Sequence, residues 1–198
     1  SHPVRSNKPH NQLRIIAGRW RGRKLAFAPV PGLRPTPDRV RETLFNWLGP
    51  VIAGKRCLDL YAGSGALGLE AASRGAAEVV LVDSNTSVTG ILRQQLQRLD
   101  AGQVRVLQAD ATAYLRGQAQ PYDIVFLDPP FREGHLDGII RQLEDGGWLS
   151  ADAWVYIEAE RQQLPDLPPN WTVHRHRTAG QVAYYLVRRT LRPEPAAG

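Results

Sequence analysis

The segment Cys57–Glu70, CLDLYAGSGALGLE, places the strongest constraint on how this 198-residue chain can fold. Its first residues are apolar around a single acid, Asp59, as expected at the end of a buried strand. Gly63 and Gly65 then permit a tight turn and a close backbone approach by a ligand. From Ala66 the apolar residues recur at helical spacing. Strand, glycine turn and helix form the opening unit of a nucleotide-binding α/β fold, with free backbone N–H groups at the start of the helix.

Strand and helix signals alternate along the rest of the chain, which predicts a parallel sheet with helices on both faces. A final pair of strands, with Ala179-Gly180 between them, should close the sheet in antiparallel fashion. The expected strands are 56–60, 79–82, 104–107, 123–127, 154–157, 171–177 and 182–187, and the expected helices are 66–74, 88–99, 111–115 and 136–144.

The basic residues are concentrated at the N-terminus. The net charge is +6, and residues 1–24 carry seven lysines and arginines without an acid. This asymmetry favours an arm that binds a polyanion, although a solvated basic tail is the alternative. Two short strands, 13–17 and 24–27, predict a β-hairpin that projects from the main domain, with the charged turn 18–22 at its tip. Because cationic and aromatic groups together suit RNA, we expect contacts from Arg19, Trp20, Arg21, Arg23 and Lys24.

A proline-rich linker follows, and a helix then begins near Thr36 and runs to about Leu48. Thr36 is expected as its N-cap, with Pro37 at the first helical position. The helix should bury one apolar face, and Arg39 and Arg41 are interpreted as surface charges unless they serve a site.

Four acids lie at or near the C-terminal ends of the first four predicted strands of the α/β region: Asp59, Asp83, Asp110 and Asp128. A single acid there is usually a turn former, but ligands of open α/β sheets bind outside these strand ends. Asp83 is placed to bind ribose hydroxyls, Asp110 and the Ala111 N–H to bind adenine, and Asp59 to meet an ammonium group. These groups suit S-adenosylmethionine better than a dinucleotide, whose pyrophosphate Asp59 would repel. The expected cofactor-binding residues are Asp59, Ala62, Gly63, Ser64, Gly65, Asp83, Asp110, Ala111 and Asp128.

The stretch Asp128-Pro129-Pro130-Phe131 is the most specific signal for chemistry. Its prolines cannot continue a strand ladder, so they form a rigid corner and leave the Pro129 carbonyl free. The carboxylate of Asp128 and this carbonyl can accept both hydrogens of a planar amine, and Phe131 can stack on the base that carries it. A bare strand-ending turn is the alternative. We therefore expect Asp128, Pro129 and Phe131 to be catalytic, orienting the nitrogen lone pair toward a methyl donor.

These motifs resemble those of class I S-adenosylmethionine-dependent methyltransferases. The segments RIIAGRWRGRKL, from Arg14, and RPTPDRVRETLF, from Arg34, resemble more narrowly the bacterial 16S ribosomal RNA guanine-N2 methyltransferases. The resemblance implies a Rossmann-like, seven-stranded, mostly parallel sheet whose last strand is antiparallel. It implies methylation of the exocyclic N2 amine of a guanine in 16S rRNA, within an assembled or partly assembled small ribosomal subunit. It also makes Arg34, Thr36 and Arg39 further candidates for contact with the RNA.

The expected organisation is an N-terminal arm and hairpin (1–35), a methyltransferase domain (36–190) and a flexible tail (191–198). One cysteine, Cys57, no apolar run of about 20 residues and no signal peptide favour the reducing cytoplasm and no membrane partner. We expect a monomer. No His/Cys cluster suggests a metal. Two alternatives stay open: a DNA methyltransferase acting on adenine N6 or cytosine N4, and an RNA-binding protein without catalysis.

Overall fold

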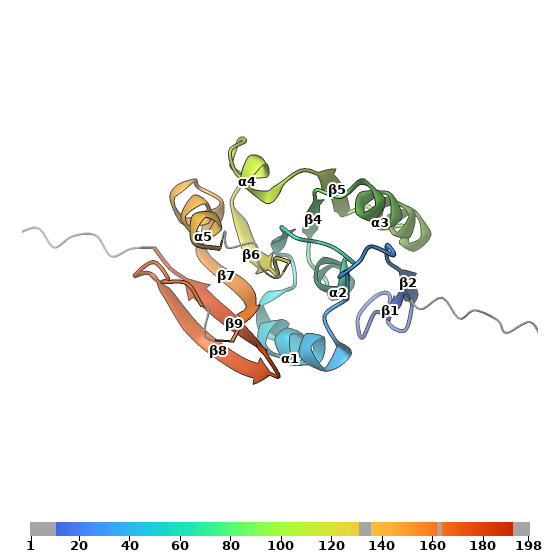
Figure 1. The fold of residues 1–198 in the computed structure, drawn as a ribbon, viewed down its shortest axis with the longest axis horizontal. Helices are drawn as coiled ribbons and strands as arrows, with labels where there is room; N and C mark the ends of the chain where they lie inside the picture. The colour runs from blue at the N-terminus through green and yellow to red at the C-terminus, as the bar shows by residue number, and fades with distance from the viewer. Residues whose placement is uncertain (1–10, 131–135, 162–163, 192–198) are drawn as a thin grey trace, which may run out of the picture.

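A computed structural model describes residues 11–130, 136–161 and 164–191 (Figure 1). Its strands are β1 (Gln12–Arg14), β2 (Lys24–Ala26), β3 (Arg56–Asp59), β4 (Glu78–Asp83), β5 (Val104–Gln108), β6 (Tyr122–Leu127), β7 (Leu149–Glu160), β8 (Trp171–Ala179) and β9 (Val182–Arg189). Its helices are α1 (Asp38–Leu48), α2 (Ala66–Ser73), α3 (Thr86–Leu99), α4 (Ala111–Tyr114) and α5 (Leu136–Asp145), with a short 3-10 helix, η1 (Gly49–Val51).

Seven strands form one sheet in the order β5-β4-β3-β6-β7-β9-β8. The first five of these strands are parallel, and β9 runs antiparallel to both β7 and β8. The predicted fold class is therefore confirmed. The strand expected at 154–157 is longer, because β7 pairs with β9 from Ala153 to Glu160 and joins β6 through a register shift. Exposed residues near its start, such as Asp152, hid this extension in the sequence.

Helices cover both faces of the sheet, as expected. Helices α1, α2 and α3 bury apolar side chains in one hydrophobic cluster, together with the hairpin β1–β2. Helices α4 and α5 pack in a second cluster on the opposite face. In parallel strands, alternate residues point to opposite faces, so β6 contributes Phe126 to the first cluster and Leu127 to the second. The predicted core position of Cys57 is confirmed, since its side chain is buried.

The N-terminal hairpin is formed, but the expectation that it projects from the domain is wrong. Figure 1 shows β1 and β2 at the end of the molecule away from β8 and β9, beside α2 and α3. Leu13 and Leu25 pair across the two strands and are both buried. Apolar residues on one side of the hairpin explain this docking, since burying them removes their surface from water.

Helix α1 begins one residue later than expected. Its N-cap is Pro37, and no side chain caps the helix start. The predicted capping role of Thr36 is therefore wrong. The predicted apolar face is confirmed, with Leu44, Phe45 and Leu48 buried. Arg41 is also buried, at 1% exposure, so its interpretation as a surface charge is wrong, whereas Arg39 is exposed.

No helix within the described ranges combines the length and the apolar character that a membrane crossing needs.

Candidate functional site

The glycine turn after β3 has the geometry that its sequence predicts. Gly63 and Gly65 adopt φ values of 54° and 80°, a region that favours glycine. Gly65 immediately precedes α2, and a Cβ atom on it would lie 2.7 Å from a methyl carbon of Leu92. The backbone N–H of Gly63 donates to Oδ2 of Asp83 at 3.0 Å. This bond ties the turn to the end of the neighbouring strand β4.

Asp59 lies beneath this turn, and its side chain is 1% exposed. The N–H of Gly68, in α2, donates to its Oδ2 at 3.1 Å. A Cβ on Gly68 would lie 2.2 Å from Leu81, so this third glycine lets α2 approach the sheet closely. Burial is the main cause that raises the pKa of Asp59 to about 7; nearby Asp83 also raises it, while backbone N–H groups favour the ionised form. Burial therefore makes the charged form of Asp59 unfavourable, and a cation or further donors would offset this cost.

The second carboxyl oxygen of Asp59 indicates which kind of ligand this site can bind. Oδ1 is buried and has no hydrogen-bond partner among the described residues. A buried acceptor without a donor is costly, and an ammonium group would remove that cost and lower the pKa. The site thus fits a ligand with a cationic amine.

Asp83 and Asp110 have local partners as well as free accepting capacity. Asp83 accepts from the N–H groups of Gly63 and Asn85, at 3.0 and 2.9 Å. Asp110 is the N-cap of α4 and accepts from the Ala113 N–H at 3.2 Å. Each carboxyl oxygen has two lone pairs, so these bonds orient the groups without using them up. The two acids end β4 and precede α4, on the edge of the sheet where ligands of this architecture bind.

Two further residues of the expected cofactor site shape the turn itself. The carbonyl of Ala62 accepts from the Gly65 N–H at 2.7 Å, and the hydroxyl of Ser64 accepts from the Ala66 N–H at 3.2 Å. Both side chains are buried.

Asp128 follows β6 directly, and its carboxyl group is held by two side chains from distant segments. The hydroxyl of Thr36, which is 6% exposed, donates to it, and the carboxyl group of Glu158 is also hydrogen-bonded to it. Burial is the main cause that raises the pKa of Asp128 well above its usual range, and Glu158 and Asp59 raise it further, whereas Thr36 opposes the rise. Among the described residues, no backbone N–H donates to the Pro129 carbonyl. Phe131 lies outside the described residues.

Glu158, in β7, is a residue that the sequence reading missed. The hydroxyl of Tyr156 donates to its Oε1 at 3.0 Å. Leu127 pairs with Ile157 in the parallel ladder, so Asp128 and Glu158 follow a registered pair. The available signal was Glu158 itself, an acid that directly follows the apolar run WVYI near the end of a strand beside the Asp-Pro-Pro corner.

The candidate RNA contacts separate into exposed and buried residues. The exposed ones are Arg19, Arg21, Arg23, Lys24, Arg34 and Arg39. Trp20 is 3% exposed and belongs to the core, so the expectation that its ring is displayed for RNA is wrong. The indole has a large apolar surface, so its burial in the core is more favourable than its exposure to solvent. The Arg19 guanidinium carbon lies 5.4 Å from the ring centroid.

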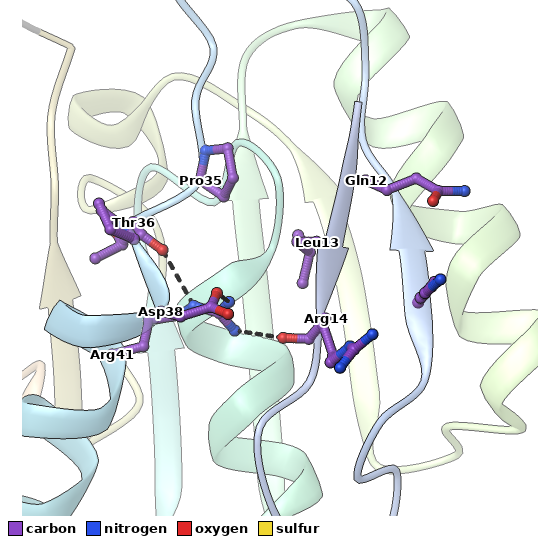
Figure 2. A pocket seen from close by; sticks show the side chains of 9 residues that line it. Gln12, Leu13, Arg14, Pro35, Thr36, Asp38 and Arg41 are labelled. Atoms are coloured by element: carbon purple, nitrogen blue, oxygen red, sulfur yellow. Dashed lines mark hydrogen bonds and ion pairs between the residues drawn. The ribbon is translucent and has the colours of Figure 1, made fainter. Parts of the chain in front are cut away.

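A groove of about 320 Å³ separates the hairpin from the start of α1 (Figure 2). Arg14 and Lys24 bring positive charge to the hairpin side, and Thr36 reaches it from the other side. The groove therefore lies between the basic hairpin and the residue that holds Asp128. Its lining consists of Gln12, Leu13, Arg14, Lys24, Pro35, Thr36, Pro37, Asp38 and Arg41.

Comparisons with known proteins decide the family. A family model described as conserved hypothetical protein 95 matches residues 13–188. Ribosomal RNA small subunit methyltransferase D of Escherichia coli (strain K12) is 52% identical over 187 residues, which cover 94% of each protein. This chain belongs to the family of ribosomal RNA small subunit methyltransferase D. The homologue of that name from Haemophilus influenzae is 42% identical and covers 92% of this chain and 97% of its own length. The solved structure of Escherichia coli yhhF, at 53% identity, has a TM-score of 0.85 over 92% of this chain and 100% of that one.

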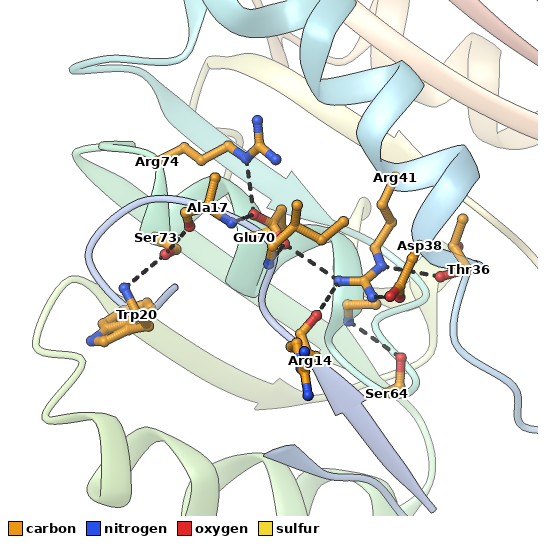
Figure 3. Close-up of polar contacts among 12 residues, drawn as sticks. Arg14, Ala17, Trp20, Thr36, Asp38, Arg41, Ser64, Glu70, Ser73 and Arg74 are labelled. Atoms are coloured by element: carbon orange, nitrogen blue, oxygen red, sulfur yellow. Dashed lines mark hydrogen bonds and ion pairs between the residues drawn. The ribbon is translucent and has the colours of Figure 1, made fainter. Parts of the chain in front are cut away.

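A buried polar network joins the hairpin to the helix that follows the glycine turn in this member of the family (Figure 3). Glu70, in α2, is 0% exposed. Its carboxylate accepts from the backbone N–H groups of Ile16 and Ala17, at 2.8 and 3.1 Å, and from the side chains of Arg74 and Arg41, at 2.9 and 3.3 Å. Ser73 adds a further tie, since its hydroxyl donates to the Ala17 carbonyl at 2.6 Å.

Arg41 extends this network from α1 toward Asp128. Its guanidinium group donates to the carbonyls of Arg14 and Thr36, at 2.9 and 3.1 Å, and pairs with Asp38. Because the Thr36 hydroxyl binds Asp128, one set of contacts runs from the hairpin to the Asp-Pro-Pro corner. Within the described ranges, no group of His, Cys, Asp and Glu has the geometry of a metal site.

Proposed function

We propose that this chain transfers the methyl group of S-adenosylmethionine to the exocyclic N2 amine of a guanine in small-subunit ribosomal RNA. One observation carries this function: in a chain of this family, the half-buried Asp128 lies beside the buried Asp59, at the ends of the adjacent strands β6 and β3. Asp128 would accept hydrogen bonds from the substrate amine, and Asp59 would accept them from the amine of the methyl donor. The RNA target follows the names of the relatives.

The chain's own residues supply the contacts that a methyl donor of this kind needs. Asp59 would bind the ammonium group through its unpartnered Oδ1. The backbone at Ala62–Gly65 would lie against the bound S-adenosylmethionine. Asp83 would accept hydrogen bonds from the ribose hydroxyls, and Asp110 with the Ala111 N–H would bind adenine. When bound, S-adenosylmethionine supplies an electrophilic methyl group on a sulfonium centre.

The Asp-Pro-Pro corner would orient the substrate amine. An exocyclic amine is a poor nucleophile because its lone pair is delocalised into the ring. Asp128 and the Pro129 carbonyl would accept its two hydrogens and favour a pyramidal nitrogen, which helps the transition state more than the ground state. Thr36 fixes the Asp128 carboxyl group for this task. Phe131 stays a predicted stacking partner of the base.

The basic hairpin would hold the surrounding RNA. Arg19, Arg21, Arg23 and Lys24 are exposed on a hairpin that the core fixes in place. They would bind phosphates while the target base leaves its neighbours and enters the site, and Arg34 and Arg39 would add charge at the groove. We extend the proposal to a monomer acting in the cytoplasm on an assembled or partly assembled subunit.

A methylation assay with small subunits from cells that lack this activity tests the proposal. We expect labelled methyl groups from S-adenosylmethionine to appear in RNA as N2-methylguanosine, and Asp128→Ala to lower the rate about 100-fold or more. Asp152→Ala is a matched control, because Asp152 is exposed and lies near the start of β7, away from the site. Product found as N6-methyladenosine or N4-methylcytosine in DNA, or an Asp128→Ala variant as active as the control, would contradict the proposal.

A further inference from the structure

The Asp-Pro-Pro corner explains how an amine is bound but not which base carries it. An exocyclic amine with two hydrogens is present on guanine, adenine and cytosine alike. A protein that acts on guanine alone needs a group that recognises a neighbouring atom of the base. The structure places such a group, Glu158, beside Asp128.

Three observations position Glu158. The parallel register of β6 and β7 brings Asp128 and Glu158 next to each other, immediately after the pair Leu127 and Ile157. Residues two apart in a strand share a face, so Glu158 lies on the face of Tyr156, which belongs to the cluster beneath α1. The Tyr156 hydroxyl binds Oε1 of Glu158 at 3.0 Å and fixes the direction of the carboxyl group.

Glu158 is also only half-buried, unlike the fully buried Glu70. Neither Lys nor Arg among the described residues forms an ion pair with it. Its hydrogen-bonding neighbours are a hydroxyl group and another carboxyl group. Two adjacent carboxyl groups repel each other when both are charged. A ligand with two neighbouring N–H donors would satisfy both groups.

Guanine has this arrangement of donors. Its Watson–Crick edge carries N1–H next to the N2 amine, whereas adenine and cytosine have an unprotonated ring nitrogen next to their amines. We infer that Glu158 determines the specificity for guanine: its carboxylate accepts the N1–H of the base while Asp128 and the Pro129 carbonyl accept the hydrogens of N2. This inference rests on the proposed function. Adenine and cytosine would turn a lone pair toward Glu158 and be rejected.

The experiment compares guanine with 2-aminopurine, which keeps the 2-amine but has an unprotonated N1. Subunits are reconstituted with either base at the nucleotide that mapping identifies as the target. Methylation of both substrates is measured for the wild type, Glu158→Gln and Glu160→Gln. Glu160 is a matched control, because it lies two residues further along the same face of β7 and pairs with Val182.

We expect the wild type and Glu160→Gln to prefer guanine strongly by kcat/KM. The glutamine of Glu158→Gln can donate to N1 of 2-aminopurine, so we expect the preference to fall about 10-fold or more while binding of S-adenosylmethionine is unchanged. Tyr156→Phe, which leaves Glu158 in place without its orienting hydroxyl, should reduce the preference by a smaller factor. It provides a second measurement if the glutamine variant is poorly folded.

The two levels of the proposal fail in different ways. If the wild type methylates no guanine N2, the proposed function is overturned. If the wild type is active and both Glu158→Gln and Tyr156→Phe keep its full preference for guanine, the function stands and the role of Glu158 is wrong.

Discussion

Two carboxyl groups on the same side of the sheet, the buried Glu70 and the half-buried Asp128, have opposite surroundings. Glu70 receives four donors from the hairpin, α1 and the residue that follows α2, two of them cationic. Asp128 receives one hydroxyl donor, and its other side-chain neighbour, Glu158, is an acid. The protein surrounds Glu70 with all the partners that a buried charge needs, whereas Asp128 depends on donors from a bound ligand.

This difference separates a structural acid from an acid that is available for ligands. A buried charge is tolerated where hydrogen bonds and opposite charges surround it, and removal of one partner exposes the cost of burying the other. Glu70 therefore holds the hairpin and α1 on α2. Asp128 and Asp59 instead contribute unfavourable free energy in the free protein, which bound donors would offset.

Arg41→Met tests the structural side of the comparison and should have the largest effect on stability. The variant keeps most of the side-chain volume but leaves Glu70 short of a cation and the Arg14 and Thr36 carbonyls short of a donor. We expect the free energy of unfolding in urea to fall by about 3–5 kcal/mol. Arg39→Met, on the exposed face of the same helix, should change it by less than about 0.5 kcal/mol. Equal effects of the two substitutions would show that the Glu70 network adds no stability.

Asp59→Asn tests the acids that are available for ligands. This substitution should stabilise the protein when no cofactor is bound. The pKa of Asp59 is raised to about 7, so the folded state holds the proton more tightly than the unfolded state. The stability that this proton gives is complete below pH 4 and is lost as the pH rises to about 7. An asparagine carries no charge, so at pH 8 we expect a gain of about 1–3 kcal/mol over the wild type, which shrinks toward pH 4.

The same variant should lose affinity for S-adenosylmethionine, since the acceptor for its ammonium group is weakened. Urea unfolding across this pH range and calorimetric titration at pH 8 measure the two effects. Asp152→Asn, at an exposed position, serves as the control. A variant that is less stable than the wild type at pH 8, or one that binds as tightly, would place Asp59 with Glu70 among the structural acids.

The part of the site that the sequence could predict is local. Gly63, Gly65 and Asp59 lie close together in the chain, and the parallel fold brings Asp83 and Asp128 to the same edge of the sheet. The alternation of strands and helices likewise predicted the sheet and both of its covered faces. Backbone sterics and periodicity decide these features, and both can be read from neighbouring residues.

The missed features depend on contacts between distant segments. Arg41 has the spacing of a surface charge, and only its partner Glu70, 29 positions away, explains its burial. Trp20 lies between arginines, so its chemistry resembles an RNA contact, but its ring is buried in the core and its backbone N–H donates to Ser73 of α2. Likewise, the bonds from Thr36 and Glu158 to Asp128 exist only because separate segments meet at one strand end. Patterns along the chain do not encode such pairings.

Replacing Arg19, Arg21 and Arg23 together with alanine should have the smallest effect on stability and a selective effect on RNA binding. These side chains are exposed, and the hairpin is held by backbone bonds to Glu70 and Ser73 instead, so unfolding should change by less than about 0.5 kcal/mol. Each lost phosphate contact reduces the salt dependence of binding, and the slope of log K against log salt should fall by about 2. A triple variant of the exposed Arg105, Arg116 and Arg141 has the same net charge and should keep the wild-type slope. If both triple variants flatten the slope equally, total charge rather than the hairpin governs RNA binding, and the Glu70 network would then support the fold alone.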